Sequence, residues 1–276
     1  MLGLGTAVNR GGFVGGAAPA ARLLDTFSGA AAAYSLRLLS NSYSGNTIKV
    51  RRASDNAELD IGFSNGSLDT SAISTHCGSN DGFVTTWYDQ SGNARNATQT
   101  NQGKQPKIYD GTDGVVTENG KPAFNLTADH LDLVSFKLGD PDFHATIVAN
   151  FTFSSATGLF GDYPEENDFV AWTGSAWRVR PYGADFGSTK PSGQSLIQVF
   201  ATQSNGIGVY SNNALIANLG SNASASAEFF VEDILTIGGG TWAALGTAQE
   251  YIFYPSDQTS NRADIDSAIN TFYSIY

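Results

Sequence analysis

The sequence predicts an all-β protein, built as a sandwich or a barrel. Charged residues make up only 15% of the chain, below the usual ~25%, and 31 glycines help to fill the gap. A hydrophobic content of 41% excludes a disordered chain. Short alternating runs are separated by turn residues every 8–12 positions, as is typical of β-sandwiches. With 276 residues, such a fold commonly forms one domain.

The second half of the chain carries the strongest strand signals. Residues 144–153 alternate between apolar and polar types, which predicts a half-buried strand. Residues 195–219 predict a three-strand meander with turns at 204–206 and 212–213. Further strands are predicted over 158–163, 168–174, 176–183, 228–240 and 248–255.

The first half is predicted to begin with a helix over residues 31–39, which are Ala-rich, with Ser28 as a cap. Two strands are expected over 47–63, around a turn at 54–56, and another over 82–88. Short strands follow over 106–109, 114–124, which includes the hairpin signal Asn119-Gly120, and 131–136.

A terminal helix is predicted within residues 259–276. Ile265, Ala268, Ile269 and either Phe272 or Tyr273 fall on one helical face. Two aspartates, at 264 and 266, lie near the positive end of the helix dipole.

Residues 1–22 differ from the domain expected over 23–276. They are rich in Gly and Ala and carry isolated apolar residues: Leu2, Leu4, Val8, Phe13 and Val14. Two interpretations stay open: a frayed tail, or a docking arm that orders against a partner. The segment lacks the features of a signal peptide, and no run of eighteen apolar residues occurs. We therefore expect synthesis in the cytoplasm and no membrane insertion.

The charge balance excludes two partner classes. The net charge is −11, and the one basic cluster is Lys49, Arg51 and Arg52, which a solvated strand face explains. Nucleic acids and anionic membrane surfaces attract basic patches, so neither is an expected partner.

The sequence also predicts no metal and no cofactor. Cys77 is the single cysteine, so it is expected to be a buried structural residue without a disulfide. On a strand, the adjacent His76 would face the opposite way. The three histidines are scattered and no EF-hand spacing occurs, so neither zinc nor an EF-hand calcium site is predicted.

The stretch "YDQSGN" over residues 88–93 ends the strand at 82–88 and could be an active-site loop, a sugar-binding loop or a turn. We interpret it as a structural corner. Asp89 and Asn93 can cap backbone N–H groups, Gly92 permits a positive φ, and Gln90 can bridge to a neighbouring strand.

Two resemblances make these expectations more specific. The strand order of the second half resembles a concanavalin A-like jelly roll of the laminin-G and pentraxin type, which implies a jelly-roll β-sandwich with a short N-terminal helix and a C-terminal helix. Three stretches resemble the catalytic domain of the α-L-arabinofuranosidase B family: S-G-x-x-x-x-V-x-R-x-S-D over 44–55, Y-D-Q-S-G-N with T-Q at 98–99, and Y-P-S-D at 254–257. Domains of this form also occur in bacteriophage virion proteins.

The residues that the family uses for catalysis are not matched. Such retaining enzymes need two carboxylates ~5–5.5 Å apart. The resemblance puts the family's acid/base Asp at Gly240 and its nucleophilic Glu at Phe169 or Val170. The vicinal cysteines of the family's sugar pocket are missing, and the partner of Cys77 aligns with Gly82.

Other carboxylates could serve a different purpose. Residues 161–169 hold the densest acidic cluster, near several aromatic residues. We favour a solvated loop, and the alternative is a carbohydrate-binding rim with aromatic platforms. The rim would comprise Asp162, Glu165, Glu166, Asp168, Trp172, Trp177, Tyr182 and Trp242.

The preferred hypothesis is a non-enzymatic bacteriophage virion protein, as a head decoration, head fibre or tail-associated component with a lectin-like, glycan-binding sandwich. Its partners would be other virion proteins or further copies, reached through the N-terminal arm, and a cell-surface glycan. Its location would be the virion. The alternatives are an arabinofuranosidase-type glycoside hydrolase and a free lectin-like adhesin.

Overall fold

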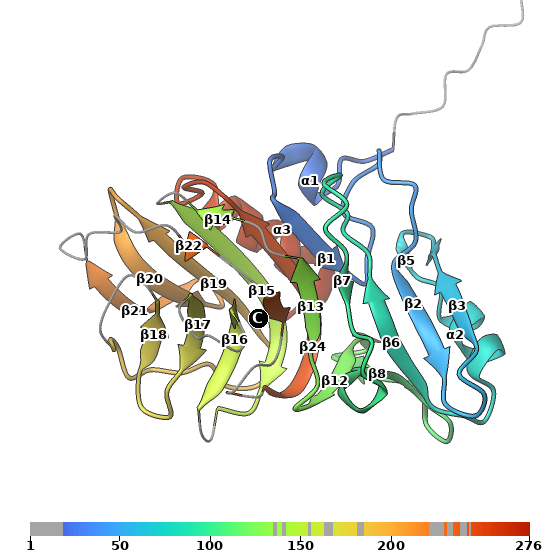
Figure 1. The fold of residues 1–276 in the computed structure, drawn as a ribbon. Coiled ribbons are helices and arrows are strands. Elements are labelled where there is room, and N and C mark those ends of the chain that lie inside the picture. The colour runs from blue at the N-terminus through green and yellow to red at the C-terminus, as the bar shows by residue number, and fades with distance from the viewer. Residues whose placement is uncertain are drawn as a thin grey trace, which may run out of the picture.

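The protein, seen in a computed structural model, is an antiparallel β-sandwich with helices on its outer faces (Figure 1). The structure describes residues 19–134, 137–139, 142–153, 156–162, 168–180, 185–220, 229–230, 234–237, 242 and 244–276. The apolar residues expected to form a docking arm, Leu2, Leu4, Val8, Phe13 and Val14, lie outside these ranges.

The helical elements are α1 (Leu23–Thr26), α2 (Thr70–Cys77), α3 (Arg262–Tyr273) and the 3-10 turn η1 (Gln102–Lys104). The strands of the first half are β1 (Ala32–Ser35), β2 (Ile48–Arg52), β3 (Glu58–Ile61), β4 (Phe63–Ser64), β5 (Ser67–Leu68), β6 (Gly82–Trp87), β7 (Ala97–Thr98), β8 (Lys107–Asp110), β9 (Gly114–Val115), β10 (Thr117–Glu118), β11 (Lys121–Pro122), β12 (Phe124–Thr127) and β13 (Leu131–Val134). Those of the second half are β14 (Lys137–Gly139), β15 (Phe143–Phe151), β16 (Thr157–Asp162), β17 (Phe169–Trp172), β18 (Trp177–Val179), β19 (Ser195–Thr202), β20 (Gly206–Ser211), β21 (Ala214–Gly220), β22 (Phe229–Phe230), β23 (Ile234–Ile237) and β24 (Leu245–Tyr254).

Three antiparallel groups of strands make up the sandwich. One layer has the order β21–β20–β19–β15–β24–β1, and the facing layer has the order β13–β23–β16–β17–β18. A third group, β3–β2–β6–β8, joins the first layer through β12, which pairs with both β8 and β24. This arrangement confirms the predicted jelly-roll-like sandwich.

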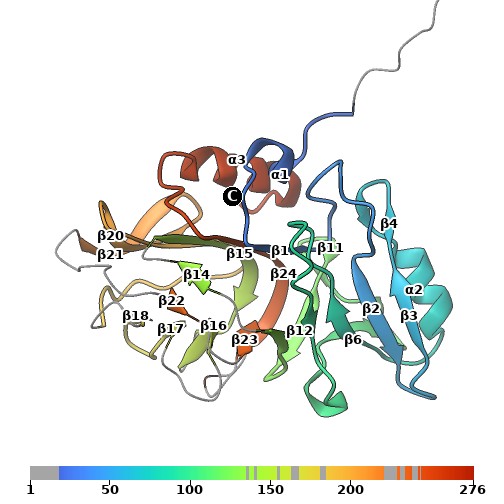
Figure 2. The same ribbon diagram turned by 45° about the horizontal axis from the view of Figure 1, so that its top comes forward.

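The central strands β15 and β19 are buried almost throughout, because both faces of their sheet are covered. Figure 2 shows α3 on one side of this sheet and β16, β17 and β18 on the other. On the helix side, Ile265 and Ile269 of α3 pack in one cluster with Val148, Leu196 and Ile252 of the sheet. The C-terminal helix and its apolar face are as predicted.

The Ala-rich segment at 31–39 is not helical, and that prediction was wrong. It contains β1, which pairs with β24 so that Ala32 and Ala33 lie opposite Phe253 and Ile252. Both alanines are fully buried, and their small side chains fit between larger core residues. Tertiary packing therefore outweighs the helix propensity of alanine. The short N-terminal helix is instead the single turn α1.

A helix that the sequence analysis did not predict, α2, carries Cys77 and His76. Asp69 caps it by accepting hydrogen bonds from the backbone N–H groups of Ser71 and Ala72. Cys77 is buried as a free thiol, as predicted, and it packs in the main core.

The predicted turns join the predicted strands. Asn212 and Asn213 connect β20 and β21 with φ of 50° and 64°, and Asn119 and Gly120 connect β10 and β11 with φ of 50° and 70°. Two consecutive positive φ angles match the twist of a tight β-hairpin.

Candidate functional site

The corner that follows β6 is held together by the side chain of Asp89. One carboxylate oxygen accepts from the backbone N–H of Ala33 at 2.9 Å and from that of Ser91 at 2.8 Å. The other accepts from the Arg95 N–H at 3.0 Å and from the Ser91 hydroxyl at 2.8 Å. Asp89 is only 4% exposed. Its oxygens are occupied within the fold, which suits a structural role.

Gln90 fastens the same corner to the segment around β1. Its Oε1 accepts from the Leu39 N–H at 2.8 Å, and its Nε2 donates to the carbonyls of Ser35 and Arg37 at 2.9 and 3.0 Å. Gly92 has a φ of 91°, as the turn requires.

Asn93 acts differently from the expectation. Its Nδ2 donates to the carbonyls of Ala30 and Ala31 at 3.1 and 3.0 Å instead of capping N–H groups. The corner therefore satisfies carbonyls as well as N–H groups of the β1 segment.

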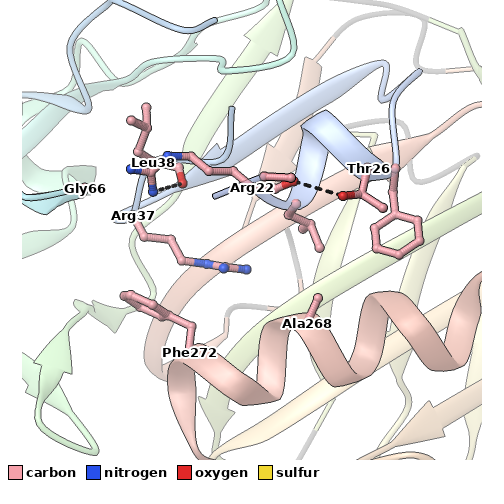
Figure 3. A pocket seen from close by; sticks show the side chains of 10 residues that line it. Arg22, Thr26, Arg37, Leu38, Gly66, Ala268 and Phe272 are labelled. Carbon is pink, nitrogen blue, oxygen red and sulfur yellow. Dashed lines mark hydrogen bonds between the residues drawn. The ribbon is translucent and has the colours of Figure 1, made fainter. Parts of the chain in front are cut away.

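A pocket of 210 Å³ lies between α1, α3 and the segment after β1 (Figure 3). Arg37 stands in it, with its guanidinium 4.9 Å from the centre of the Phe272 ring. The guanidinium makes a buried two-point ion pair with Glu250, at 2.8 and 2.9 Å. The guanidinium is therefore committed to the fold, where it links Glu250 of β24 to the Phe272 ring of α3.

Of the residues proposed for a carbohydrate-binding rim, several cannot be placed. Glu165, Glu166 and Tyr182 lie outside the described residues, and only the backbone of Asp162 is described, at the end of β16. Asp168 is buried at the start of β17.

Trp172 and Trp177 are core residues, which contradicts their expected role as exposed platforms. They are 3% and 0% exposed, and their ring centres lie 5.8 Å apart. Phe153 packs against both, and Trp177 Nε1 donates to the Thr189 carbonyl at 2.9 Å. The two residues face each other across the β17–β18 pair, so both rings point into the sandwich.

Trp242 remains available as a platform. It is half-buried, with its ring centre 5.1 Å from that of Phe169 and 5.6 Å from the Arg178 guanidinium. Arg178 in turn forms a two-point ion pair with Asp185, with one contact at 2.7 Å, and this hydrogen bonding raises the pKa of Arg178. We call Phe169, Arg178, Asp185 and Trp242 the Trp242 patch.

The Trp242 patch offers the chemistry that sugars need. An aromatic face can pack on the C–H face of a sugar ring, and a guanidinium beside a carboxylate can pair with hydroxyl groups. Sequence reasoning missed Phe169, Arg178 and Asp185 as members. Their pairing depends on β17 and β18 lying side by side, which single-residue patterns do not reveal.

The two positions at which the resemblance puts the family's nucleophile, Phe169 and Val170, are both apolar. Val170 is fully buried in the core of β17, and the half-buried Phe169 packs on Trp242. Gly240, the position of the acid/base residue, lies outside the described residues. No cluster of three or more His, Cys, Asp or Glu that could hold a metal occurs in the described ranges. Nor does the described part contain a helix long and apolar enough to cross a membrane.

The relation between Cys77 and Gly82 fits the resemblance. A Cβ added to Gly82 would lie 2.7 Å from the Cys77 sulfur. The resemblance aligns Gly82 with a cysteine, and the two positions are close enough for a disulfide.

Comparison with known proteins agrees with this geometry. The model of the family "Alpha-L-arabinofuranosidase B, catalytic" matches residues 26–129. Solved structures with a similar fold include a GH54 α-L-arabinofuranosidase soaked with a cyclic sulfate inhibitor (TM-score 0.66) and an arabinofuranosidase complexed with arabinofuranosyl-α-1,2-xylobiose (TM-score 0.63). Each shares 19% identity over 87% of this chain. No curated protein matches the sequence.

The chain aligns with 62% of each of those arabinofuranosidases, which is less than two thirds of their length. The likeness at this identity concerns the fold. Together with the match over residues 26–129, it shows that this chain has an arabinofuranosidase-like β-sandwich and resembles the catalytic domain of α-L-arabinofuranosidase B.

Proposed function

We propose that this protein is a non-enzymatic structural component of a bacteriophage virion, with a sandwich that binds glycan. One observation carries the non-enzymatic part. The nucleophile position of the resembled family is occupied by Phe169 and Val170, of which Val170 is sealed in the core. A retaining hydrolase needs a nucleophilic carboxylate beside the sugar, and neither side chain can act as one.

Glycan binding is supported by the Trp242 patch. The Trp242 ring centre lies 5.1 Å from that of Phe169 and 5.6 Å from the Arg178 guanidinium, and Asp185 holds Arg178 in place at 2.7 Å. A single sugar ring could contact all of these groups. A face that carries an aromatic platform but no nucleophilic carboxylate can bind a sugar without hydrolysing it.

Assignment to a virion rests on the resemblance to domains of phage particles and on the apolar residues of the N-terminal segment. Apolar residues at the spacing of Leu2, Leu4 and Val8 suit a segment that is ordered by a partner surface. Neighbouring copies or other virion proteins would supply that surface.

A glycan array tests the binding role. The intact protein should bind a subset of glycans, and Trp242→Ala should weaken binding about tenfold, because aromatic contacts of this kind contribute about 1 kcal/mol or more. Phe63→Ala is the control, since Phe63 is a part-buried aromatic residue on β4, at the opposite end of the molecule (Figure 2). Equal loss in both variants, or no glycan bound, would contradict the role.

Particle incorporation tests the virion role. Deletion of residues 1–20 should abolish incorporation into phage particles while glycan binding by the free protein persists. If the full chain binds glycan but never enters particles, the protein is a free adhesin instead.

A further inference from the structure

A second polar site lies on the β2–β6 face, far from the Trp242 patch. A groove of 420 Å³ is lined by strand residues of β2, β6 and β7 and by the loop at 99–105, and it adjoins another of 400 Å³ through Gln102 and Gln105. Figure 1 shows β2 and β6 at one end of the molecule and β17 and β18 at the other. We call the combined cavity the Arg51 groove.

Its floor is a hydrogen-bond chain centred on Arg51, in which Arg51, Gln99 and Gln105 are buried and Asn56 is exposed. Arg51 is 7% exposed, and its Nε donates to Gln105 Oε1 at 2.7 Å while its Nη1 donates to Asn56 Oδ1 at 3.0 Å. Gln105 donates onward to the Gln99 carbonyl at 2.8 Å. The chain fixes the guanidinium, which also lies 5.0 Å from the centre of the Phe83 ring. Such preorganisation lowers the cost of binding a partner.

Arg51 has no counter-ion at contact distance among the described residues. The other groove cations are paired: Lys49 lies 3.9 Å from Glu58 and from Asp60, and Lys107 lies 2.7 Å from Asp81. Burial lowers the pKa of Arg51, and the charge of Glu58, which acts from beyond ion-pair distance, opposes that change. A buried charge normally has a partner. Acidic residues outnumber basic ones in this chain, 26 to 15, and yet no described carboxylate pairs with Arg51. This exception points to an anion from outside the protein as the partner of Arg51.

The Nη2 group of Arg51 makes no hydrogen bond to the described residues, which leaves the guanidinium able to donate to a ligand. Arginine commonly recognises a carboxylate by donating N–H groups of its guanidinium to the carboxylate oxygens. Two carboxylates also line the groove: Glu58, which lies 3.9 Å from Lys49, and Asp129 in the adjoining part. The other lining residues include hydroxyls and amides, which match a polyol: Thr86, Thr98, Thr100 and Gln102.

A peptide fits this groove less well than a sugar. Peptides add to free sheet edges, but β2 is paired with β3 and β6, and β6 is paired on its other side with β7 and β8. Phe83 is the one aromatic residue among the described residues that line the groove, and Arg51 and Lys107 already lie near its ring. We propose that the Arg51 groove binds an acidic saccharide, with a uronate carboxylate on Arg51 and sugar hydroxyls on the threonine and glutamine side chains.

Calorimetric titration with trigalacturonate tests this site, with its methyl ester as the uncharged match. The acid should bind, and the ester should bind at least about tenfold more weakly, as expected for a lost charge-assisted hydrogen bond. Arg51→Gln should weaken binding of the acid by a similar factor. Added salt should weaken it as well, because the attraction is electrostatic.

Two exposed threonines provide variants that leave the core untouched. Thr98 lines the groove and Thr117 lies outside it, on β10. Thr98→Glu should weaken trigalacturonate binding several-fold by repulsion, and Thr117→Glu should leave it unchanged. Trp242→Ala should also leave it unchanged, which separates this site from the proposed glycan patch.

Equal affinity for the acid and its ester would overturn the proposal, as would no binding up to about 10 mM, the range of the weakest useful affinities. Equal loss in the Thr98 and Thr117 variants would have the same consequence. Tighter binding of triglutamate than of trigalacturonate would assign the groove to acidic peptides and overturn the saccharide class.

Discussion

The corner after β6 and the face of β17 and β18 differ in what they keep of the resembled fold. At the corner, Asp89 and Gln90 match the family's residues, and their polar atoms are bonded within the fold. On the other face, the resemblance puts the family's nucleophilic carboxylate at Phe169 or Val170, and neither residue is acidic. The comparison separates residues that hold a scaffold from residues that perform its chemistry. A conspicuous polar motif can belong to the first class.

The largest expected effect is at the corner. Asp89→Ala leaves the buried backbone N–H of Ala33 and the part-buried N–H groups of Ser91 and Arg95 without their acceptor, so the unfolding free energy should fall by about 3–5 kcal/mol. Chemical denaturation measures this. The control is Asp69→Ala, which removes a helix cap at a more exposed position and should cost about 1 kcal/mol. If the two substitutions lowered the unfolding free energy equally, Asp89 would contribute no more to stability than an ordinary helix cap.

A second test concerns a buried scaffold residue whose hydrogen-bonding groups have no partner among the described residues. His144 on β15 is fully buried, neither ring nitrogen has a hydrogen-bond partner among the described residues, and burial lowers its pKa to about 4. In the unfolded chain it titrates near 6.5. The contribution of His144 to the unfolding free energy is therefore fully present above pH 6.5, where the ring is neutral in both states. It is lost as the pH falls toward 4, by roughly 3 kcal/mol in all.

His144→Leu should remove that loss, and the measurement is the unfolding free energy of both proteins between pH 7 and pH 4. Asp266 acts in the opposite direction, because burial raises its pKa to about 6 and its protonation favours the fold as the pH falls. Both proteins are therefore compared in an Asp266→Asn background. Parallel pH profiles would contradict the assignment to His144.

The third test restores a family feature of the scaffold. Gly82→Cys should form a disulfide with Cys77, because the added Cβ would lie 2.7 Å from the sulfur. A loop this short should gain about 2 kcal/mol in the oxidised form over the reduced form of the same variant. Free-thiol titration and denaturation measure both. Two persistent free thiols under oxidising conditions would show that the positions do not correspond.

The smallest effect is expected on the altered face. Phe169→Ala truncates a half-buried ring on Trp242 and should cost about 1 kcal/mol, well below Asp89→Ala. Denaturation measures the cost and glycan binding should weaken. A cost as large as that of Asp89→Ala would place Phe169 in the scaffold class.

The sequence predicted the sandwich, its meander, its Asn-rich turns and the terminal helix, because these follow from local periodicity and turn chemistry. It failed where tertiary contacts decide. Ala32 and Ala33 form a strand because β24 and the core accept small side chains there. The helix α2 was missed because Ser and Thr are weak helix formers, although Asp69 and Gly78 mark its two ends.

The site was harder to predict than the fold. Trp172 and Trp177 look like sugar platforms in the sequence, but cross-strand pairing turns both into the core. The Trp242 patch brings together residues from β17, β18 and two loops, so its members share no local pattern. Burial and pairing are properties of the whole sheet.

The chain has an arabinofuranosidase-like sandwich, and the central proposal is that this sandwich performs no hydrolysis. Prolonged incubation of stoichiometric protein with 4-nitrophenyl α-L-arabinofuranoside, extended to a panel of aryl glycosides, tests it most directly. We predict no release of nitrophenol above the uncatalysed rate. Release that is lost in Asp162→Asn or Glu166→Gln would contradict the claim and establish an enzyme.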